Sequence, residues 1–238
     1  MTSRTAITHK LIVAGLAMLM FVSWGLWTSS REGRRLERLT QQLSDPDKVT
    51  RAAAAEELGK LGPPAKSAVP ALVKLLQDKD EKVRVFATTA LGRIGDTSAA
   101  PLAGLTGALI DGHATVRSAA ALALSRMGPA AQTAIPALTS ALKDADARVR
   151  VYAGEALWRI TGEVDDVVEV LVEALKSPQK DVRYVAASTL GRIGPLADGA
   201  LPAIVSAIYD DDVDVRQAAS DALRLIDPLA AEALLGTR

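Results

Sequence analysis

The chain contains no cysteine, two histidines and few aromatic residues, and its 28 basic and 28 acidic residues cancel in charge. The missing cysteine excludes disulfides, thiolate catalysis and cysteine-based zinc sites. An aromatic content of 3% leaves few rings on which bases could stack, and a net charge of zero gives no general attraction to nucleic acid. We therefore expect no metal, no cofactor and no nucleic acid.

What the chain has in abundance is a repeat of 33 residues. An arginine recurs six times at this spacing, with an alanine three residues later and a leucine seven residues later. The arginines are Arg51, Arg84, Arg117, Arg150, Arg183 and Arg216. A fixed period of this length is typical of stacked helical repeats, in which each unit contacts mainly its neighbours.

Each unit divides into two helices. In the second unit the first helix, which we call helix A, is predicted over residues 81–94, with Ala87 and Leu91 on its buried stripe. A glycine closes helix A in four units, whereas the fourth and sixth units have Thr161 and Asp227 in that place. The second helix, helix B, begins near a proline in several units. Neither helix can bury its stripe alone, so neighbouring units must share one core.

The order Asp, five residues, Arg, Ala and then Leu-Gly-x-Ile-Gly resembles the HEAT-like repeats first noted in phycobilisome bilin lyases. The resemblance implies an all-α fold, an α-solenoid or right-handed superhelix of about six 33-residue helix pairs. It also implies that the aspartate six residues before each arginine pairs with it, as a ladder along the stack. These aspartates are Asp45, Asp78, Asp111, Asp144 and Asp210, with Ser177 in the remaining place. Function is left open, because this repeat serves many roles.

Most polar groups of the sequence have a structural interpretation. A pair that recurs in every unit serves what every unit shares, so we interpret the ladder as structural and not catalytic. A second basic column is interpreted as a solvated helix face, with a nucleic-acid or phospholipid stripe as the alternative. It consists of Lys60, Arg93, Arg126, Arg159 and Arg192. The acidic group of Glu163, Asp165, Asp166, Glu169 and Glu173 lacks the glycine-punctuated loop of an EF-hand. A related metalloenzyme, deoxyhypusine hydroxylase, holds iron with histidine–glutamate pairs, and this chain has none.

The feature that points most directly to function is an apolar excess on the outside of helix A. The position after the ladder arginine should face solvent, and large side chains stand there or nearby. They are Val85, Phe86, Val151, Tyr152, Trp158 and Tyr184. We predict that they form a protein-binding patch, because exposed apolar surface marks docking sites and Tyr and Trp are frequent anchors. The alternative is that they flank the contact between successive A helices.

Residues 11–27 form the longest apolar stretch. As a helix this run would extend about 26 Å, slightly less than the roughly 30 Å hydrocarbon core. We predict one N-terminal transmembrane or signal-anchor helix within residues 1–30, which places the protein at the cell membrane. A cleaved signal peptide is the alternative. The basic residues on both sides of the stretch leave open whether the repeats are cytoplasmic or periplasmic/extracellular.

We divide the chain into the anchor or signal segment 1–30, a capping half-repeat over 31–43 and the HEAT-like solenoid over 44–238. The predicted function is a membrane-tethered, non-catalytic scaffold that binds a protein partner. Two alternatives stay open: a lyase-type enzyme auxiliary that handles a tetrapyrrole, and a structural subunit of a membrane complex.

Overall fold

The computed structural model describes residues 31–236, and over this range the regular structure is helical throughout. Residues 31–42 are helical and lead into pairs of helices. The A helices are α2 (Lys48–Leu61), α4 (Glu81–Ile94), α6 (Ala114–Met127), α8 (Ala147–Thr161), α10 (Lys180–Ile193) and α12 (Val213–Ile226). The B helices are α3 (Val69–Leu75), α5 (Ala99–Ala108), α7 (Ile135–Ala141), α9 (Asp165–Ala174), α11 (Leu201–Ala207) and α13 (Pro228–Leu235). Short 3₁₀ segments, Pro63–Ala68, Gly128–Ala134 and Gly194–Ala200, precede α3, α7 and α11.

Aspartates begin four of the six A helices and glycines end five of them. The carboxylates of Asp47, Asp80, Asp146 and Asp212 accept backbone N–H bonds from the first turns of α2, α4, α8 and α12. In the fourth unit α8 runs one residue further than the other A helices, to Thr161, and Gly162 closes it in the left-handed conformation. In the sixth unit Asp227 replaces the glycine because its side chain caps α13. The absence of glycine at the usual closing position therefore has a local explanation in both units.

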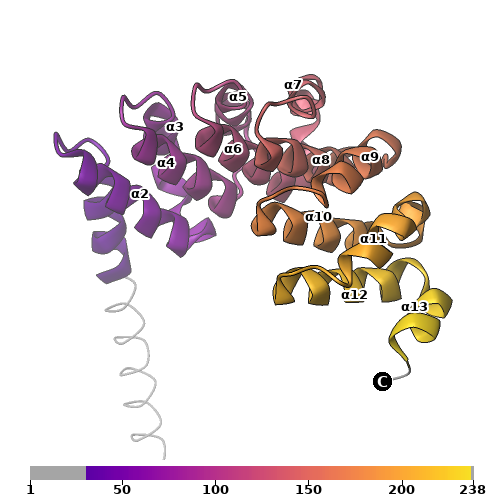
Figure 1. Cartoon of the computed structure of the whole chain (residues 1–238). Helices are drawn as coiled ribbons and strands as arrows, with labels where there is room; N and C mark the ends of the chain where they lie inside the picture. Colours follow the sequence, from indigo (N-terminus) through magenta and orange to yellow (C-terminus); the bar gives the residue numbers. More distant parts are fainter. Residues whose placement is uncertain (1–30, 237–238) are drawn as a thin grey trace, which may run out of the picture.

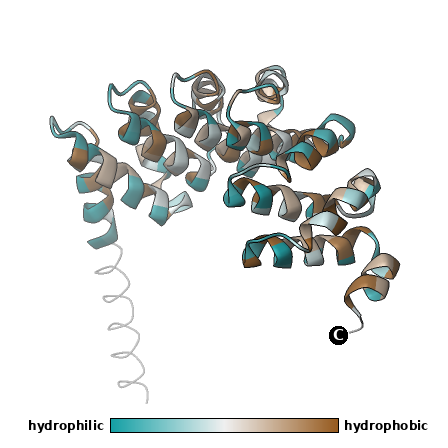
Figure 2. Ribbon diagram, in the orientation of Figure 1, coloured by the Kyte–Doolittle hydropathy of each residue, from teal (hydrophilic) through white to brown (hydrophobic). Residues whose placement is uncertain are grey.

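The core lies between the A and B helices and runs through the whole array. One leucine per A helix is buried: Leu58, Leu91, Leu124, Leu157, Leu190 and Leu223. Each of the first five B helices adds a fully buried partner: Leu72, Leu105, Leu138, Leu171 and Ile204. Burying one such side chain contributes roughly 1.5–3 kcal/mol, and no unit could achieve this burial alone. Hydrophilic residues gather in the turns that join the helices (Figure 2).

The helix pairs stack into an arch (Figure 1). The B helices lie on the outer side of the arch and the A helices on its inner side. At every junction except that between α8 and α10, an A helix packs extensively against the A helix of the next unit, for example α2 against α4 and α10 against α12. The inner side of the arch is therefore a continuous surface of A helices, and the groove between two of them is its repeating feature.

Successive A helices approach each other at a glycine. A Cβ atom added at Gly92 would lie 2.7 Å from the Cα of Ala123, and one added at Gly191 would lie 2.8 Å from the Cα of Ala222. Real Cβ atoms do not come this close to backbone, so in a densely packed contact only glycine fits. In the third unit the same place holds Ser125, a buried hydroxyl without a hydrogen-bond partner within the described chain.

In the fourth unit this place holds Trp158. An indole cannot occupy the space of a glycine, and α8 packs against α10 much less extensively than the other neighbouring A helices pack against each other. Helix α9 contacts both of them instead, and the arch changes direction at this point (Figure 1). We call the part before this junction, 31–174, the N-terminal stack and the part after it, 180–236, the C-terminal stack.

The predicted membrane anchor is contradicted and has to be withdrawn. No helix of the described range 31–236 is both long and apolar enough to cross a membrane. The longest A helix, α8, has 15 residues and spans about 22 Å, against a hydrocarbon core of roughly 30 Å. The stretch 11–27, on which the prediction rested, lies outside the described residues. The signal anchor, the membrane tether and the membrane localisation are withdrawn with it.

Candidate functional site

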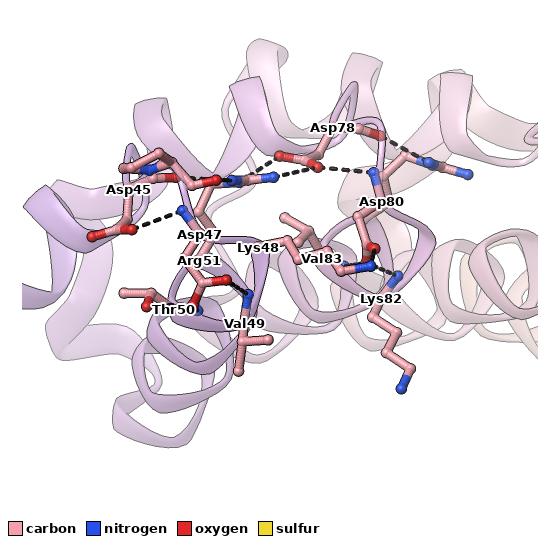
Figure 3. A network of polar contacts seen from close by, with 12 residues as sticks. Asp45, Asp47, Lys48, Val49, Thr50, Arg51, Asp78, Asp80, Lys82 and Val83 are labelled. Atoms are coloured by element: carbon pink, nitrogen blue, oxygen red, sulfur yellow. Dashed lines mark hydrogen bonds and ion pairs between the residues drawn. The ribbon is translucent and has the colours of Figure 1, made fainter.

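The same polar contact joins most neighbouring units, and Figure 3 shows it for the first two. Nε and Nη2 of Arg51 donate to the carboxylate of Asp78 at 2.8 and 3.0 Å, and Nη1 donates to the backbone carbonyl of Asp45 at 2.8 Å. The arginine thus bonds the main chain of the aspartate six residues earlier and the carboxylate of the aspartate 27 residues later. We call each arginine–carboxylate contact a rung. Further rungs join Arg84 to Asp111, Arg117 to Asp144 and Arg183 to Asp210.

The rungs keep their carboxyl groups ionised. The hydrogen bond from Arg183 lowers the pKa of Asp210 to about 2, and the hydrogen bond from Arg117 lowers the pKa of Asp144. Each carboxylate also accepts a backbone N–H from two residues further on, as Asp144 does from Asp146 at 2.8 Å. For Asp144, two of its three hydrogen bonds come from the arginine of the neighbouring unit, so these groups serve to join the units.

The ladder is interrupted between the fourth and fifth units, where Ser177 replaces the aspartate. Nη1 of Arg150 keeps its bonds to the carbonyls of Asp144 and Ala145, at 2.8 and 3.1 Å. Its Nε and Nη2 have no hydrogen-bond acceptor within residues 31–236. The junction that lacks the close glycine contact therefore also lacks a rung.

Other contacts tie α8 to α10 at this junction. The carboxylate of Glu155 is buried and accepts a hydrogen bond from Nη1 of Arg192 at 2.7 Å. The Arg192 guanidinium lies 5.3 Å from the ring centre of Trp158, within the range of a cation–π contact. Arg148 and Asp181 form an ion pair at 2.7 Å. We call Glu155, Trp158 and Arg192 the seam.

A groove runs beside the seam, between α10 and α12. Its volume is about 350 Å³, and Tyr184 and Leu225 are its large apolar residues. Both are well exposed, at 46% and 56%. Arg192 belongs to this groove as well as to the seam, and Asp214 and Asp221 also line it. We call the seam and this groove together the α10 face.

The structure places the six predicted patch residues in different environments. Val151 is 1% exposed and cannot contact a partner. Val85, Phe86, Tyr152 and Trp158 are half-buried and pack against the core. Tyr184 alone of the six is exposed. Burial, followed by the charge of Glu155, raises the pKa of Tyr152.

Sequence reasoning missed Glu155, Arg192 and Leu225 as members of this surface. A signal for the seam was present, because Trp158 stands in register with Gly59, Gly92 and Gly191. It could not be interpreted without knowing that this position meets the next A helix. The burial of Glu155 has no sequence signal, since the equivalent Glu56 in the first unit is only half-buried.

The described residues hold no group of three or more histidine, aspartate or glutamate side chains that could bind a metal ion. The acidic group singled out in the sequence runs from the turn before α9 to the last turn of that helix. Of this group, Glu163, Asp165 and Asp166 line a hollow of about 260 Å³ together with apolar side chains such as Leu157 and Val167. Nothing in this hollow pairs a nucleophile with a base.

Paired helices stacked at a 33-residue step define an α-solenoid repeat protein. The family described as HEAT repeats matches residues 36–125 and 135–224, and the family described as PBS lyase HEAT-like repeat matches residues 116–144. The chain belongs to the HEAT repeat family, which confirms the resemblance drawn from the sequence.

Solved structures share this architecture. An engineered protein is 26% identical, with a TM-score of 0.57 over 81% of this chain and 96% of that protein. A designed armadillo repeat protein in complex with the peptide (KR)4 is 22% identical, with a TM-score of 0.56 over 81% and 99%. The CpcE–CpcF complex of phycocyanin lyase from Nostoc sp. PCC7120 is 22% identical, with a TM-score of 0.47 over 82% and 94%. No curated protein matches the chain. These likenesses concern the fold, so function has to be argued from the surface.

Proposed function

We propose that the chain is a non-catalytic HEAT-repeat scaffold that binds a protein partner through the α10 face. The observation that carries this proposal is the exposure of Tyr184 and Leu225 on the two sides of one groove. Tyrosine is one of the residues enriched in binding hot spots, and interfaces combine an apolar centre with polar surroundings.

The repeat pattern supports the choice of this surface over the rest of the arch. Residues shared by all units maintain the stack, whereas a residue that departs from the pattern in one unit serves something local. Trp158 and Ser177 both depart from it at the junction beside α10, and both remove a contact that neighbouring units make. The proposed role is that of a preformed surface, and a designed armadillo repeat protein of similar fold is found in complex with a peptide.

The test begins with co-purification and mass identification of the partner, followed by titration of the purified pair. Tyr184→Ala should weaken binding at least ten-fold, because a hot-spot side chain contributes about 2 kcal/mol or more. Tyr209→Ala is the matched control, since Tyr209 is 76% exposed but lies in the turn after α11 and outside the groove.

Both variants should keep the helical circular dichroism of the wild type. An equal loss of affinity in the two variants would contradict the proposal. So would a loss in Tyr184→Ala that is matched by a loss of helical content, because the residue would then act on folding.

A further inference from the structure

At the interrupted rung the arginine donors are present, but the carboxylate that would accept from them is missing. At the four complete junctions the arginine Nε and Nη2 lie 2.7–3.0 Å from the two carboxylate oxygens of the next unit. Arg150 is held by the same two main-chain carbonyl contacts as Arg51. Its remaining donors, Nε and Nη2, are the atoms that bind a carboxylate at the four complete junctions.

The turn that should supply the carboxylate also keeps its usual form. Ser177 Oγ accepts the backbone N–H of Gln179 at 3.2 Å, as Asp210 Oδ1 accepts that of Asp212 at 2.9 Å. The Ser177 carbonyl accepts from Nη1 of Arg183 at 2.9 Å, the bond that the ladder aspartates make with their own arginine. The substitution has therefore removed a charged oxygen pair and preserved the backbone around it.

The local charges favour an anion at this place. Two carboxylates that interact with the charge of Arg150 already have cations of their own, because Asp144 is bound by Arg117 at 2.7 and 2.8 Å and Glu173 is paired with Lys176 at 2.8 Å. Arg150 itself has no carboxylate partner within the described chain. A guanidinium with two free parallel donors matches the geometry of phosphate and carboxylate oxygens.

We propose that Arg150 and the turn of Ser177 and Gln179 form a binding site for a small oxyanion of the phosphate type. Two oxygens of the anion would accept from Nε and Nη2 of Arg150, and a third would accept from the Ser177 hydroxyl, whose oxygen already accepts the Gln179 N–H. The bound anion replaces the missing aspartate and links α8 to the turn before α10. It therefore ties the N-terminal stack to the C-terminal stack across the junction where they are held least.

The experiment titrates inorganic phosphate into the full-length, ¹⁵N-labelled protein, with chloride at matched ionic strength as the reference. The observed signals are the Gln179 backbone N–H and the Arg150 Nε–H. Both should shift saturably with phosphate and not with chloride. Arg150→Gln should weaken the binding at least ten-fold, since one charge-assisted bidentate contact is lost.

Ser177→Asp is the second variant, and it guards against the possibility that Arg150→Gln folds poorly. A carboxylate at 177 restores the rung, so this variant should fold at least as stably as the wild type and bind no phosphate at this place. Arg216→Gln is the matched control. Arg216 also has only carbonyl partners, but no turn of a following unit faces it within residues 31–236, so the phosphate response should be unchanged.

Three results would overturn the proposal. One is the absence of a saturable shift at Gln179 and Arg150. Another is an undiminished shift in Ser177→Asp. The third is a loss of binding in Arg216→Gln equal to that in Arg150→Gln, because any arginine without a carboxylate partner would then explain the response without a site.

Discussion

At the scale of residues, the ladder arginine connects two units through one side chain. Arg117 donates to the carbonyl of Asp111 and to the carboxylate of Asp144, so it bonds both its own unit and the next. The 33-residue spacing was sufficient to identify these residues from the sequence. The resemblance pointed to the aspartate six residues earlier as the partner, but that residue contributes only its backbone carbonyl. The carboxylate lies 27 residues later, an offset that depends on how one unit is placed on the next.

Replacing a complete rung should destabilise the protein more than replacing the interrupted one. Arg117→Ala leaves the largely buried Asp144 carboxylate without its cation and should lower the free energy of unfolding by about 1.5–3 kcal/mol. Arg150→Ala removes no carboxylate contact and should cost less than about 1 kcal/mol in chloride buffer. Urea unfolding of the two variants measures the difference. Equal losses would show that the carboxylate contact contributes nothing.

The rungs also predict how stability depends on pH. The folded pKa of Asp210 is about 2, below the value of about 3.9 in an unfolded chain. Its contribution is therefore present above about pH 4 and is lost as the pH falls towards 2. Over this range the wild type should lose stability more steeply than Asp210→Asn, while Asp198→Asn, an exposed control in the 3₁₀ segment before α11, should follow the wild type. Urea unfolding at a series of pH values would reveal parallel curves for all three if the rung has no such role.

At the scale of elements, the glycine contact decides how closely two A helices can pack. The predicted helix over residues 81–94 coincides with α4, because its stripe and caps are local signals. The meaning of the glycine eight residues after the ladder arginine was not predictable, since it depends on the backbone of the neighbouring helix. The same limit applies to Trp158, which the sequence analysis treated as a surface residue and which the structure places between two stacks.

Gly92→Ala and Gly107→Ala should have opposite effects on stability. The first forces a Cβ atom to within 2.7 Å of the Ala123 backbone, and such overpacking costs about 1–3 kcal/mol. The second adds a Cβ atom where nothing lies within 4 Å, and better helix propensity should add up to about 0.5–1 kcal/mol. Chemical denaturation measures both changes. A neutral or stabilising Gly92→Ala would contradict the close-contact account.

At the scale of the whole molecule, the array consists of two stacks that meet at the seam. The all-helical solenoid followed from the repeat, because six copies of one pattern specify one packing solution. The membrane anchor was wrongly predicted from the apolar run over residues 11–27. Predicting where the seam lies would have required knowing that the glycine position meets the next A helix. It would also have required knowing that the arginine binds a carboxylate 27 residues later. Both facts come only from the structure.

Restoring the repeat pattern at the seam should make the fourth junction resemble the others. Since the chain has no cysteine, spin labels can be placed uniquely at the exposed, equivalent positions 107, 140, 173 and 206. In the double variant Trp158→Gly, Ser177→Asp, the 173–206 distance should change to that of the 107–140 pair. An unchanged distance would mean that these two residues do not set the junction.

The central claim is that the α10 face is where a protein partner binds, and hydrogen exchange of the purified complex tests it most directly. Backbone amides are compared between the free and the partner-bound protein. The account predicts slower exchange in α10 and α12 on binding, with unchanged exchange in α4, which carries the equivalent groove at the other end of the arch. Protection confined to α4 and its neighbours, or no protection in α10, would contradict it.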